Sequence, residues 1–218
     1  MPFKLDKLEN FFITGTGTDV GKTLISAIIC EALQADYWKP IQAGLEPETD
    51  SEWVRNMMSN SKTVVHPESY ILKFPASPHL AAMDEAIDIS LQKILSDKPV
   101  PENNLVIEGV GGLMVPLNKD EFVIDLIREL RATVIIVSRN HLGSINHSLL
   151  TAMALKANNI NVMGWIFNDE YLDYENEIVE WSGYPWIASV RRLPLINKST
   201  IHSQGVKMKE HFLRHGMH

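Results

Sequence analysis

The sequence has 218 residues, of which 45% are hydrophobic and 22% are charged, and its formal net charge is −7. This composition is typical of a globular protein, and no apolar run approaches the roughly 20 residues that span a bilayer. No block is rich in lysine or arginine, which argues against a nucleic-acid-binding surface. The single cysteine, Cys30, excludes an intrachain disulfide, and the N-terminal residues lack the apolar core of a signal peptide. We therefore expect a cytoplasmic protein that binds neither membrane nor nucleic acid.

Short apolar runs alternate with helix-like stretches along the chain. The expected strands are residues 11–14, 37–38, 105–108, 133–138, 162–167 and 186–190. The expected helices are residues 22–34, 51–58, 123–130, 145–158 and 174–182. Most strands are apolar on both faces, which is the pattern of a parallel sheet covered by helices. The alternation predicts a doubly wound α/β fold with a mostly parallel sheet, helices on both faces and a single domain over residues 1–218.

Two stretches carry weaker patterns. Residues 64–101 contain four prolines before Pro101, which predicts a winding connection with short helices. The C-terminal segment holds His211, His215 and His218 with no carboxylate neighbours that suggest a designed site, so we expect a frayed, solvated tail and not a metal site. Cys30 lies inside the first long helix, where a buried core position is the simplest interpretation.

The segment GTGTDVGKT, residues 15–23, follows the first expected strand and leads into the first expected helix. Gly15 and Gly21 enclose five residues, one more than in the usual phosphate loop. Glycines let successive backbone N–H groups converge on phosphate oxygens, and the helix N-terminus adds a positive dipole. A turn that merely starts a helix explains the pattern less well. We predict that Lys22 reaches the β and γ phosphates and that the Thr23 hydroxyl binds Mg²⁺. The predicted nucleotide-binding residues of this segment are Asp19, Val20, Gly21, Lys22, Thr23 and Leu24.

Two charged residues come at the carboxyl ends of expected strands, where ligands bind in such sheets. Lys39 precedes Pro40, which holds it extended toward the edge that carries the phosphate loop. The competing interpretation is a solvated surface lysine. Glu108 ends an otherwise apolar strand, and a carboxylate there is costly to bury unless something pairs with it. Mg²⁺ is the partner that we expect for Glu108.

Five segments in order resemble dethiobiotin synthetases. They are TGTGTDVGKT, YWKPIQAG, VIEGVGGLMVPL, LGSINHSLLT and GWIFND, and they span about residues 11–169. The resemblance implies a P-loop enzyme that is a homodimer with shared active sites. Such an enzyme uses ATP as co-substrate to join CO₂ to 7,8-diaminopelargonate (7,8-diaminononanoate), and closes the ureido ring of dethiobiotin in biotin biosynthesis. Because both the carbamate and the carbamic-phosphoric anhydride intermediates are anionic, the site should supply cations.

The resemblance also implies roles for single residues. It makes Lys39 and Lys22 catalytic, with Lys39 contacting the carbamate and the transferred phosphoryl group, and it makes Asp50 a second metal carboxylate. A helix N-cap is the alternative interpretation of Asp50. The implied metal ligands are Thr23, Asp50 and Glu108, and the further nucleotide-binding residues are Asp50, Glu108, Gly109, Val110, Gly111 and Asn168. The implied substrate residues are Lys39 and, reaching across the dimer to the substrate's tail carboxylate, Gly143, Ser144 and Asn146. Helix initiation at Gly143 and a turn at Asn168 remain the alternatives.

Three positions depart from the family pattern. Gly17 stands where aspartate is common, Ala43 stands where a small hydroxyl residue is common, and the acidic residue expected after Pro194 is missing. The last departure puts recognition of the nucleotide base in doubt. A partitioning-type switch ATPase is the main alternative, but those proteins carry a lysine five residues before the loop lysine, where this chain has Gly17. An amide-forming synthetase of cobalamin synthesis would need a glutaminase domain, for which no room remains.

Overall fold

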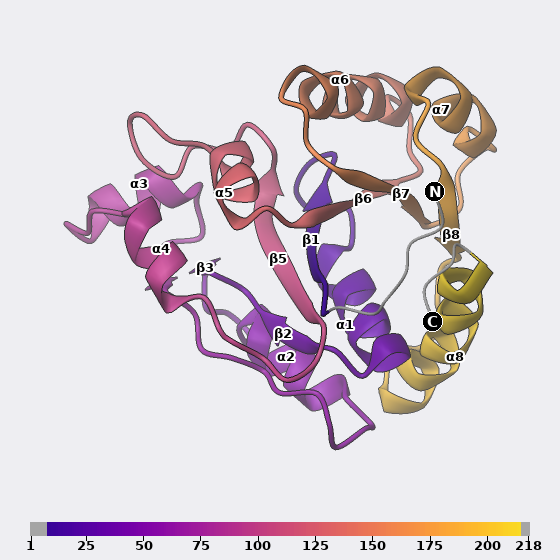
Figure 1. Ribbon diagram of the computed structural model, residues 1–218, viewed down its shortest axis with the longest axis horizontal. Coiled ribbons are helices and arrows are strands. Elements are labelled where there is room, and N and C mark those ends of the chain that lie inside the picture. The colour runs from indigo at the N-terminus through magenta and orange to yellow at the C-terminus, as the bar shows by residue number, and fades with distance from the viewer. Residues whose placement is uncertain (1–7, 215–218) are drawn as a thin grey trace.

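A six-stranded sheet forms the centre of the computed structural model, which describes residues 8–214 (Figure 1). Its strands, in spatial order, are β2 (Asp36–Trp38), β5 (Leu105–Gly112), β1 (Asn10–Gly15), β6 (Thr133–Arg139), β7 (Val162–Asn168) and β8 (Trp186–Val190). Every pairing between these strands is parallel. The doubly wound fold expected from the sequence is therefore confirmed.

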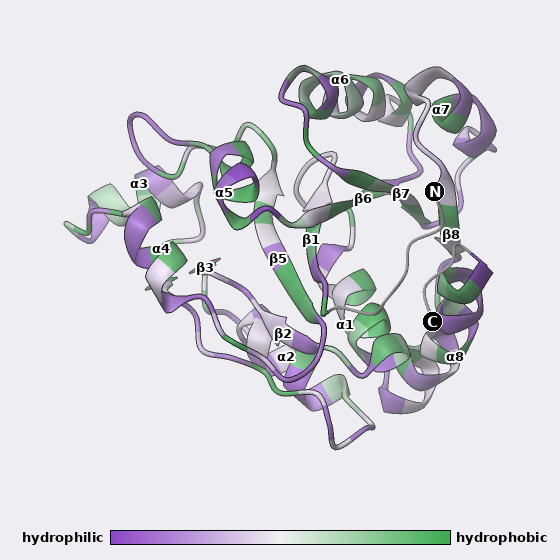
Figure 2. Cartoon of the chain, viewed as in Figure 1, coloured by the Kyte–Doolittle hydropathy of each residue, from purple (hydrophilic) through white to green (hydrophobic). Residues whose placement is uncertain are grey.

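Helices cover both faces of the sheet because successive strand residues point to opposite sides. On one face, Phe11 and Ile13 pack against α1 (Lys22–Leu33), α2 (Asp50–Met57) and α8 (Lys198–Arg214). On the other, Phe12 belongs to the core formed with α3 (Pro78–Asp84), α4 (Leu91–Asp97), α5 (Val123–Leu130), α6 (Ser144–Ala157) and α7 (Glu175–Ser182). Figure 2 shows hydrophobic residues along the central strands and mixed hydropathy on the helices around them. Within residues 8–214, no helix is both long enough and apolar enough to cross a membrane.

The connection over residues 64–101 contains the short helices expected, α3 and α4. It also contributes to a small second sheet that the sequence did not predict. In that sheet β3 (Ile41–Ala43) pairs in parallel with β4 (Tyr70–Leu72). Each strand has only three residues, which is too short to display an alternating pattern.

The C-terminal segment corrects the expectation of a frayed tail. Residues up to Arg214 form α8, which lies along α1 (Figure 1). Its apolar residues Ile201, Met208 and Phe212 are buried, at the spacing of one helix face. His211 packs edge-on against Trp186, with ring centroids 5.1 Å apart. His215 and His218 lie outside the described residues.

The strand order places the expected site at one sheet edge. β1 lies between β5 and β6, so the chain winds away from β1 in both directions, and the crevice for ligands lies beyond its carboxyl end. Glu108 pairs in register with Ile13, two residues before Gly15. The end of β5 and the start of the phosphate loop are therefore neighbours.

Candidate active site

The phosphate loop connects β1 to α1 in a conformation that requires glycine. Gly21 precedes α1 with a φ of +92°, and Asp19 also has a positive φ of +56°. A Cβ atom at Gly21 would lie 2.1 Å from Asn168 Nδ2, so a side chain there would clash as well as strain the backbone. Asn168 Nδ2 donates to the carbonyl of the buried Val20 at 2.9 Å. The amide at the end of β7 thus ties the loop to the sheet.

Lys22 is the first residue of α1 and is 8% exposed. Its ammonium group donates to the carbonyl of Gly17 at 3.1 Å and so curls back over the loop. Burial lowers the pKa of Lys22, and the charge of Glu108 opposes that shift. Leu24, two residues further on, packs against the core beneath α1. The loop therefore brings one cation to the place where phosphates would lie.

A cluster of two carboxylates, a hydroxyl and an ammonium group lies beside the loop, with Lys39 and Glu108 buried and Thr23 and Asp50 partly buried. Thr23 Oγ1 is 2.8 Å from Glu108 Oε1 and 3.0 Å from Asp50 Oδ1, as a donor shared between them. Lys39 Nζ is 3.1 Å from Glu108 Oε1 and also contacts Asp50 Oδ2. Glu108 is 1% exposed and Lys39 is 5% exposed. The interpretation of Lys39 as a solvated surface lysine is therefore wrong.

Asp50 enters this cluster because it does not cap α2. The N-cap is Thr49, whose hydroxyl accepts from the backbone N–H of Glu52 while the Glu52 carboxylate accepts from the Thr49 backbone. This capping box satisfies the helix start, and the Asp50 carboxylate turns toward Thr23 and Lys39. The N-cap interpretation of Asp50 is wrong.

The ammonium group of Lys39 offsets part of the negative charge of the two carboxylates. Burial alone would lower the pKa of Lys39, but the charges of Glu108 and Asp50 outweigh it and raise that pKa. Lys39 therefore stays an ammonium group and neutralises carboxylates that are expensive to leave unpaired. Hydroxyl and carboxylate oxygens are the ligands that Mg²⁺ prefers, and the Thr23 hydroxyl lies within 3.0 Å of one oxygen each of Asp50 and Glu108. These side chains fit a magnesium site.

A cavity of about 340 Å³ opens next to the loop, between residues 15–18, the end of β5 and α6. The predicted nucleotide residues Gly109, Val110 and Gly111 belong to this end of β5. Gly111 has a φ of +62° and turns the chain toward the cavity wall formed by residues 112–115. His147 and Thr151, one helical turn apart on α6, line the opposite wall. The sequence interpretation missed both, although they fall on one helix face.

The predicted substrate residues at the start of α6 are not part of the buried cluster. Gly143 precedes the helix with a φ of +100°, Ser144 is buried, and Asn146 is exposed. Within residues 8–214, no hydrogen bond or ion pair joins these three residues to Lys39, Asp50 or Glu108. A single chain therefore does not bring the two predicted groups into contact.

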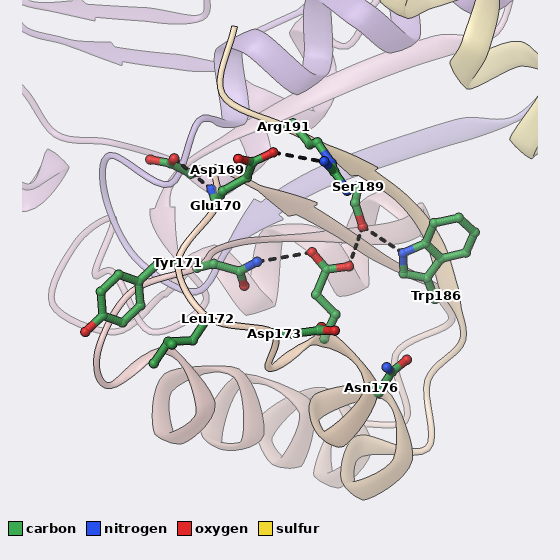
Figure 3. Close-up of a pocket in the computed structure, with 11 residues that line it drawn as sticks. Asp169, Glu170, Tyr171, Leu172, Asp173, Asn176, Trp186, Ser189 and Arg191 are labelled. Carbon is green, nitrogen blue, oxygen red and sulfur yellow. Dashed lines mark hydrogen bonds and ion pairs between the residues drawn. The ribbon is translucent and has the colours of Figure 1, made fainter.

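The far end of the sheet carries a second, acidic pocket of about 710 Å³ (Figure 3). The Glu175 carboxylate accepts from Asn140 Nδ2 at 3.1 Å and from Ser189 Oγ, and Ser189 Oγ accepts from Trp186 Nε1 at 2.9 Å. Arg191 pairs with Glu170 at 3.3 Å, with both side chains mostly exposed. The pocket lining includes Asp169, which follows Asn168, and Arg191, the first residue of the segment 191–198 that we expected near the nucleotide base.

Sequence reasoning also missed Tyr37, whose hydroxyl donates to Glu108 Oε2 at 2.9 Å. The sequence contained part of the evidence, because Tyr37 lies two residues before the predicted catalytic Lys39 in an extended segment, where such side chains point to the same side. Only the pairing of β2 with β5 reveals the contact.

A parallel sheet with a glycine loop after its first strand and an adjoining lysine–carboxylate cluster defines a nucleotide-binding protein of the P-loop class. A family model described as an AAA domain matches residues 9–200. The ATP-dependent dethiobiotin synthetase of Cytophaga hutchinsonii is 46% identical, over 92% of this chain and 97% of its own length. That of Christiangramia forsetii is 42% identical, over 93% and 97%. The chain belongs to the dethiobiotin synthetase family, whose members are ATP-dependent ligases.

The solved structures add the fold alone. A plasmid partition protein of Borrelia burgdorferi bound to AMPPNP superposes with a TM-score of 0.59 at 11% identity, covering 96% of this chain and 99% of that one. At such low identity the likeness extends to the P-loop architecture and not to the partitioning activity. It gives the switch ATPase alternative no further support.

Proposed function

We propose that this chain is an ATP- and Mg²⁺-dependent ligase that carboxylates 7,8-diaminopelargonate with CO₂ and closes the ureido ring of dethiobiotin. The observation that carries this proposal is the buried contact of Lys39 with Asp50 and Glu108, directly beside the phosphate loop of a chain of this family. The ammonium group of Lys39 could neutralise the negative charge of the carbamate and anhydride intermediates.

The proposed reaction needs positioning and charge neutralisation more than covalent help. One amine of the substrate adds to CO₂ and loses a proton, which gives a carbamate. A carbamate oxygen attacks the γ phosphorus and ADP leaves, which gives a carbamic-phosphoric anhydride. The second amine attacks the carbamate carbon, loses a proton and displaces phosphate to close the ring. Lys22 neutralises the β and γ phosphates, and Lys39 neutralises the carbamate and the transferred phosphoryl group.

Thr23, Asp50 and Glu108 are the residues that we propose to hold Mg²⁺. When bound, Mg²⁺ would neutralise phosphate oxygens of the nucleotide. Lys39 contacts two of the same carboxylates in the structure. We propose that Lys39 leaves these carboxylates for the substrate when the nucleotide and its metal arrive.

The remaining nucleotide contacts come from both neighbours of β1. We propose that the backbone of Asp19 to Leu24 surrounds the phosphates and that Gly109, Val110 and Gly111 border the nucleotide from β5. We propose that Asn168, whose Nδ2 donates to the Val20 carbonyl at 2.9 Å, contacts the base. This proposal leaves only Asn168 and the segment after β8 for base recognition.

We propose that the enzyme is a homodimer with shared active sites. Gly143, Ser144 and Asn146 stand apart from the cluster in one chain, and the adjoining α6 region exposes apolar side chains: Leu142 is 78% exposed and Met153 is 64% exposed. A helix N-terminus with free N–H groups suits the tail carboxylate of the substrate. In a dimer this helix start would serve the neighbouring chain. A single cytoplasmic domain, without nucleic-acid or membrane partners, completes the proposal.

The direct test is formation of dethiobiotin, detected by mass spectrometry, from diaminopelargonate, bicarbonate, Mg²⁺ and ATP. We expect one ADP per dethiobiotin and no product when any one component is omitted. ATP turnover that is independent of the diamine, with no dethiobiotin, would contradict the proposal and favour a switch ATPase.

A further inference from the structure

Tyr37 contacts the oxygen of Glu108 that the loop cluster leaves free. Its hydroxyl donates to Glu108 Oε2 at 2.9 Å, whereas Glu108 Oε1 is 2.8 Å from Thr23 Oγ1 and 3.1 Å from Lys39 Nζ. β2 and β5 are adjacent, with Tyr37 beside Val106. Because side chains alternate along a strand, Tyr37, Val106 and Glu108 all face α1. The two oxygens of Glu108 thus have separate partners.

The donor to Oε2 is neutral, and this matters for a cation site. A tyrosine hydroxyl is uncharged near pH 7, and this one reaches Glu108 Oε2 as a neutral donor at 2.9 Å. A lysine or arginine in its place would satisfy Oε2 but would cancel the negative charge that attracts a metal. A phenol orients the carboxylate and leaves that charge intact. Ligating carboxylates are commonly oriented by such outer hydrogen bonds.

We propose that Tyr37 is a positioning residue for the metal site, whose hydroxyl fixes the Glu108 carboxylate so that Oε1 is presented to the divalent cation beside Thr23 and Asp50. This inference rests on the proposed function, because it assigns Glu108 to the metal. It adds to the site Tyr37, the middle residue of β2, which belongs neither to the phosphate loop nor to the residues that follow the strands.

The simpler explanation is that a buried phenol needs an acceptor and found Glu108. Tyr70 offers a matched control, because it is 9% exposed and its hydroxyl donates to the Asp88 carbonyl at 3.3 Å and accepts from Ser90 N at 2.9 Å. Both Tyr37→Phe and Tyr70→Phe remove one buried hydroxyl. Only Tyr37→Phe releases a proposed metal ligand.

The first measurement is Mn²⁺ binding to the ADP complex by electron paramagnetic resonance, without diamine or CO₂. We expect Tyr37→Phe to weaken Mn²⁺ binding by about 10- to 100-fold, as loss of an outer hydrogen bond to a metal ligand does. Tyr70→Phe should bind Mn²⁺ as the unmodified protein does. In the dethiobiotin assay, Tyr37→Phe should raise the Mg²⁺ concentration for half-maximal rate by a similar factor, with kcat at saturating Mg²⁺ changed much less. Unchanged Mn²⁺ binding in Tyr37→Phe, or equal weakening in both variants, overturns the proposal.

Tyr37→Phe leaves Glu108 Oε2 without a donor and can fold poorly for that reason alone. A double-mutant cycle then still tests the proposal. Glu108→Gln and Tyr37→Phe/Glu108→Gln carry no carboxylate at this position, and they should bind Mn²⁺ equally if Tyr37 acts through Glu108. A further loss in the double variant overturns the inference. The binding measurement is independent of turnover. A chain that shows the expected Mn²⁺ pattern but makes no dethiobiotin would therefore contradict the proposed function and not this inference.

Discussion

The two ends of the candidate site are built differently. At the phosphate end, Thr23, Lys39 and Glu108 are held by a buried network within one chain. At the base end, Arg191 and Glu170 form an exposed ion pair beside the acidic pocket. The side chains of the first region form hydrogen bonds and ion pairs with one another, whereas the paired side chains of the second are mostly exposed to solvent.

The difference follows from the energy of burying charge. A carboxylate such as Glu108 remains in the interior only with partners on each oxygen, so the phosphate end must be complete before any ligand arrives. An exposed pair such as Arg191 and Glu170 contributes little and constrains little. Substitutions at the phosphate end should therefore have large effects, and the base end should tolerate change.

The largest effect is expected for Lys22→Ala. It removes the cation that we propose to face the β and γ phosphates, so nucleotide binding and turnover should both fall to near background. Equilibrium binding of a fluorescent ATP analogue and the dethiobiotin assay measure the two losses. Lys93→Ala removes an exposed lysine paired with Asp97 and serves as the control. Near-normal ATP binding in Lys22→Ala would contradict the assignment of the loop.

Lys39→Ala should separate binding from chemistry. Nucleotide binding should remain nearly intact, while kcat falls by roughly 10²-fold or more, as loss of a transition-state contact does. Without Mg²⁺ the variant should also unfold at lower temperature than the unmodified protein, because Asp50 and Glu108 lose their counterion, and Mg²⁺ with nucleotide should narrow that gap. Turnover at the normal rate would remove Lys39 from the catalytic residues.

The start of α6 tests whether a completed site needs a second chain. Lys39→Ala and Asn146→Ala, each inactive or nearly so alone, are mixed in equal amounts and allowed to exchange subunits. With random pairing, heterodimers with one intact site should restore about a quarter of the normal activity. Exchange is verified by native mass spectrometry. If heterodimers form and no activity returns, the shared site is wrong.

The smallest effect is expected at the base end. The segment after β8 lacks the acidic residue that the family resemblance leads us to expect after Pro194, so we expect one base contact to be absent. A site without such a contact should separate ATP from GTP by about 1 to 2 kcal/mol, or roughly 5- to 30-fold in kcat/KM. Steady-state rates with saturating diamine and Mg²⁺ measure this ratio. A preference for ATP beyond a few hundredfold would show that contacts elsewhere replace the missing acid.

The sequence predicts best what depends on neighbouring residues. The phosphate loop is a local motif, and Lys39 follows an apolar strand as expected. Glu108 lies inside its strand, because β5 continues to Gly112, but the pairing of β5 with β1 and β2 still brings Glu108 beside the loop. Tyr37 was missed because its partner Glu108 lies 71 residues away and the contact depends on which strands are adjacent. Asp50 was ambiguous because a helix start can be capped by either of two residues, and the side chain of Thr49 takes that role.

The C-terminal helix was missed for another reason. Its histidines and lysines suggested a solvated segment, but Ile201, Met208 and Phe212 share the face that packs on the sheet. The segment is an amphipathic helix, and its many polar residues on the outer face made the apolar face difficult to recognise in the sequence. Tertiary packing against α1, which no local pattern records, stabilises the helix.

The central claim is that a substrate carbamate attacks the γ phosphate in a site lined by Lys22 and Lys39. Single-turnover reactions begun with freshly dissolved C¹⁸O₂ test it most directly, because the anhydride transfers one carbamate oxygen to the released phosphate. We expect one ¹⁸O atom in each phosphate formed with dethiobiotin, after correction for exchange between CO₂ and water, and no label in phosphate from ATP hydrolysis. Dethiobiotin formed alongside unlabelled phosphate would contradict the account.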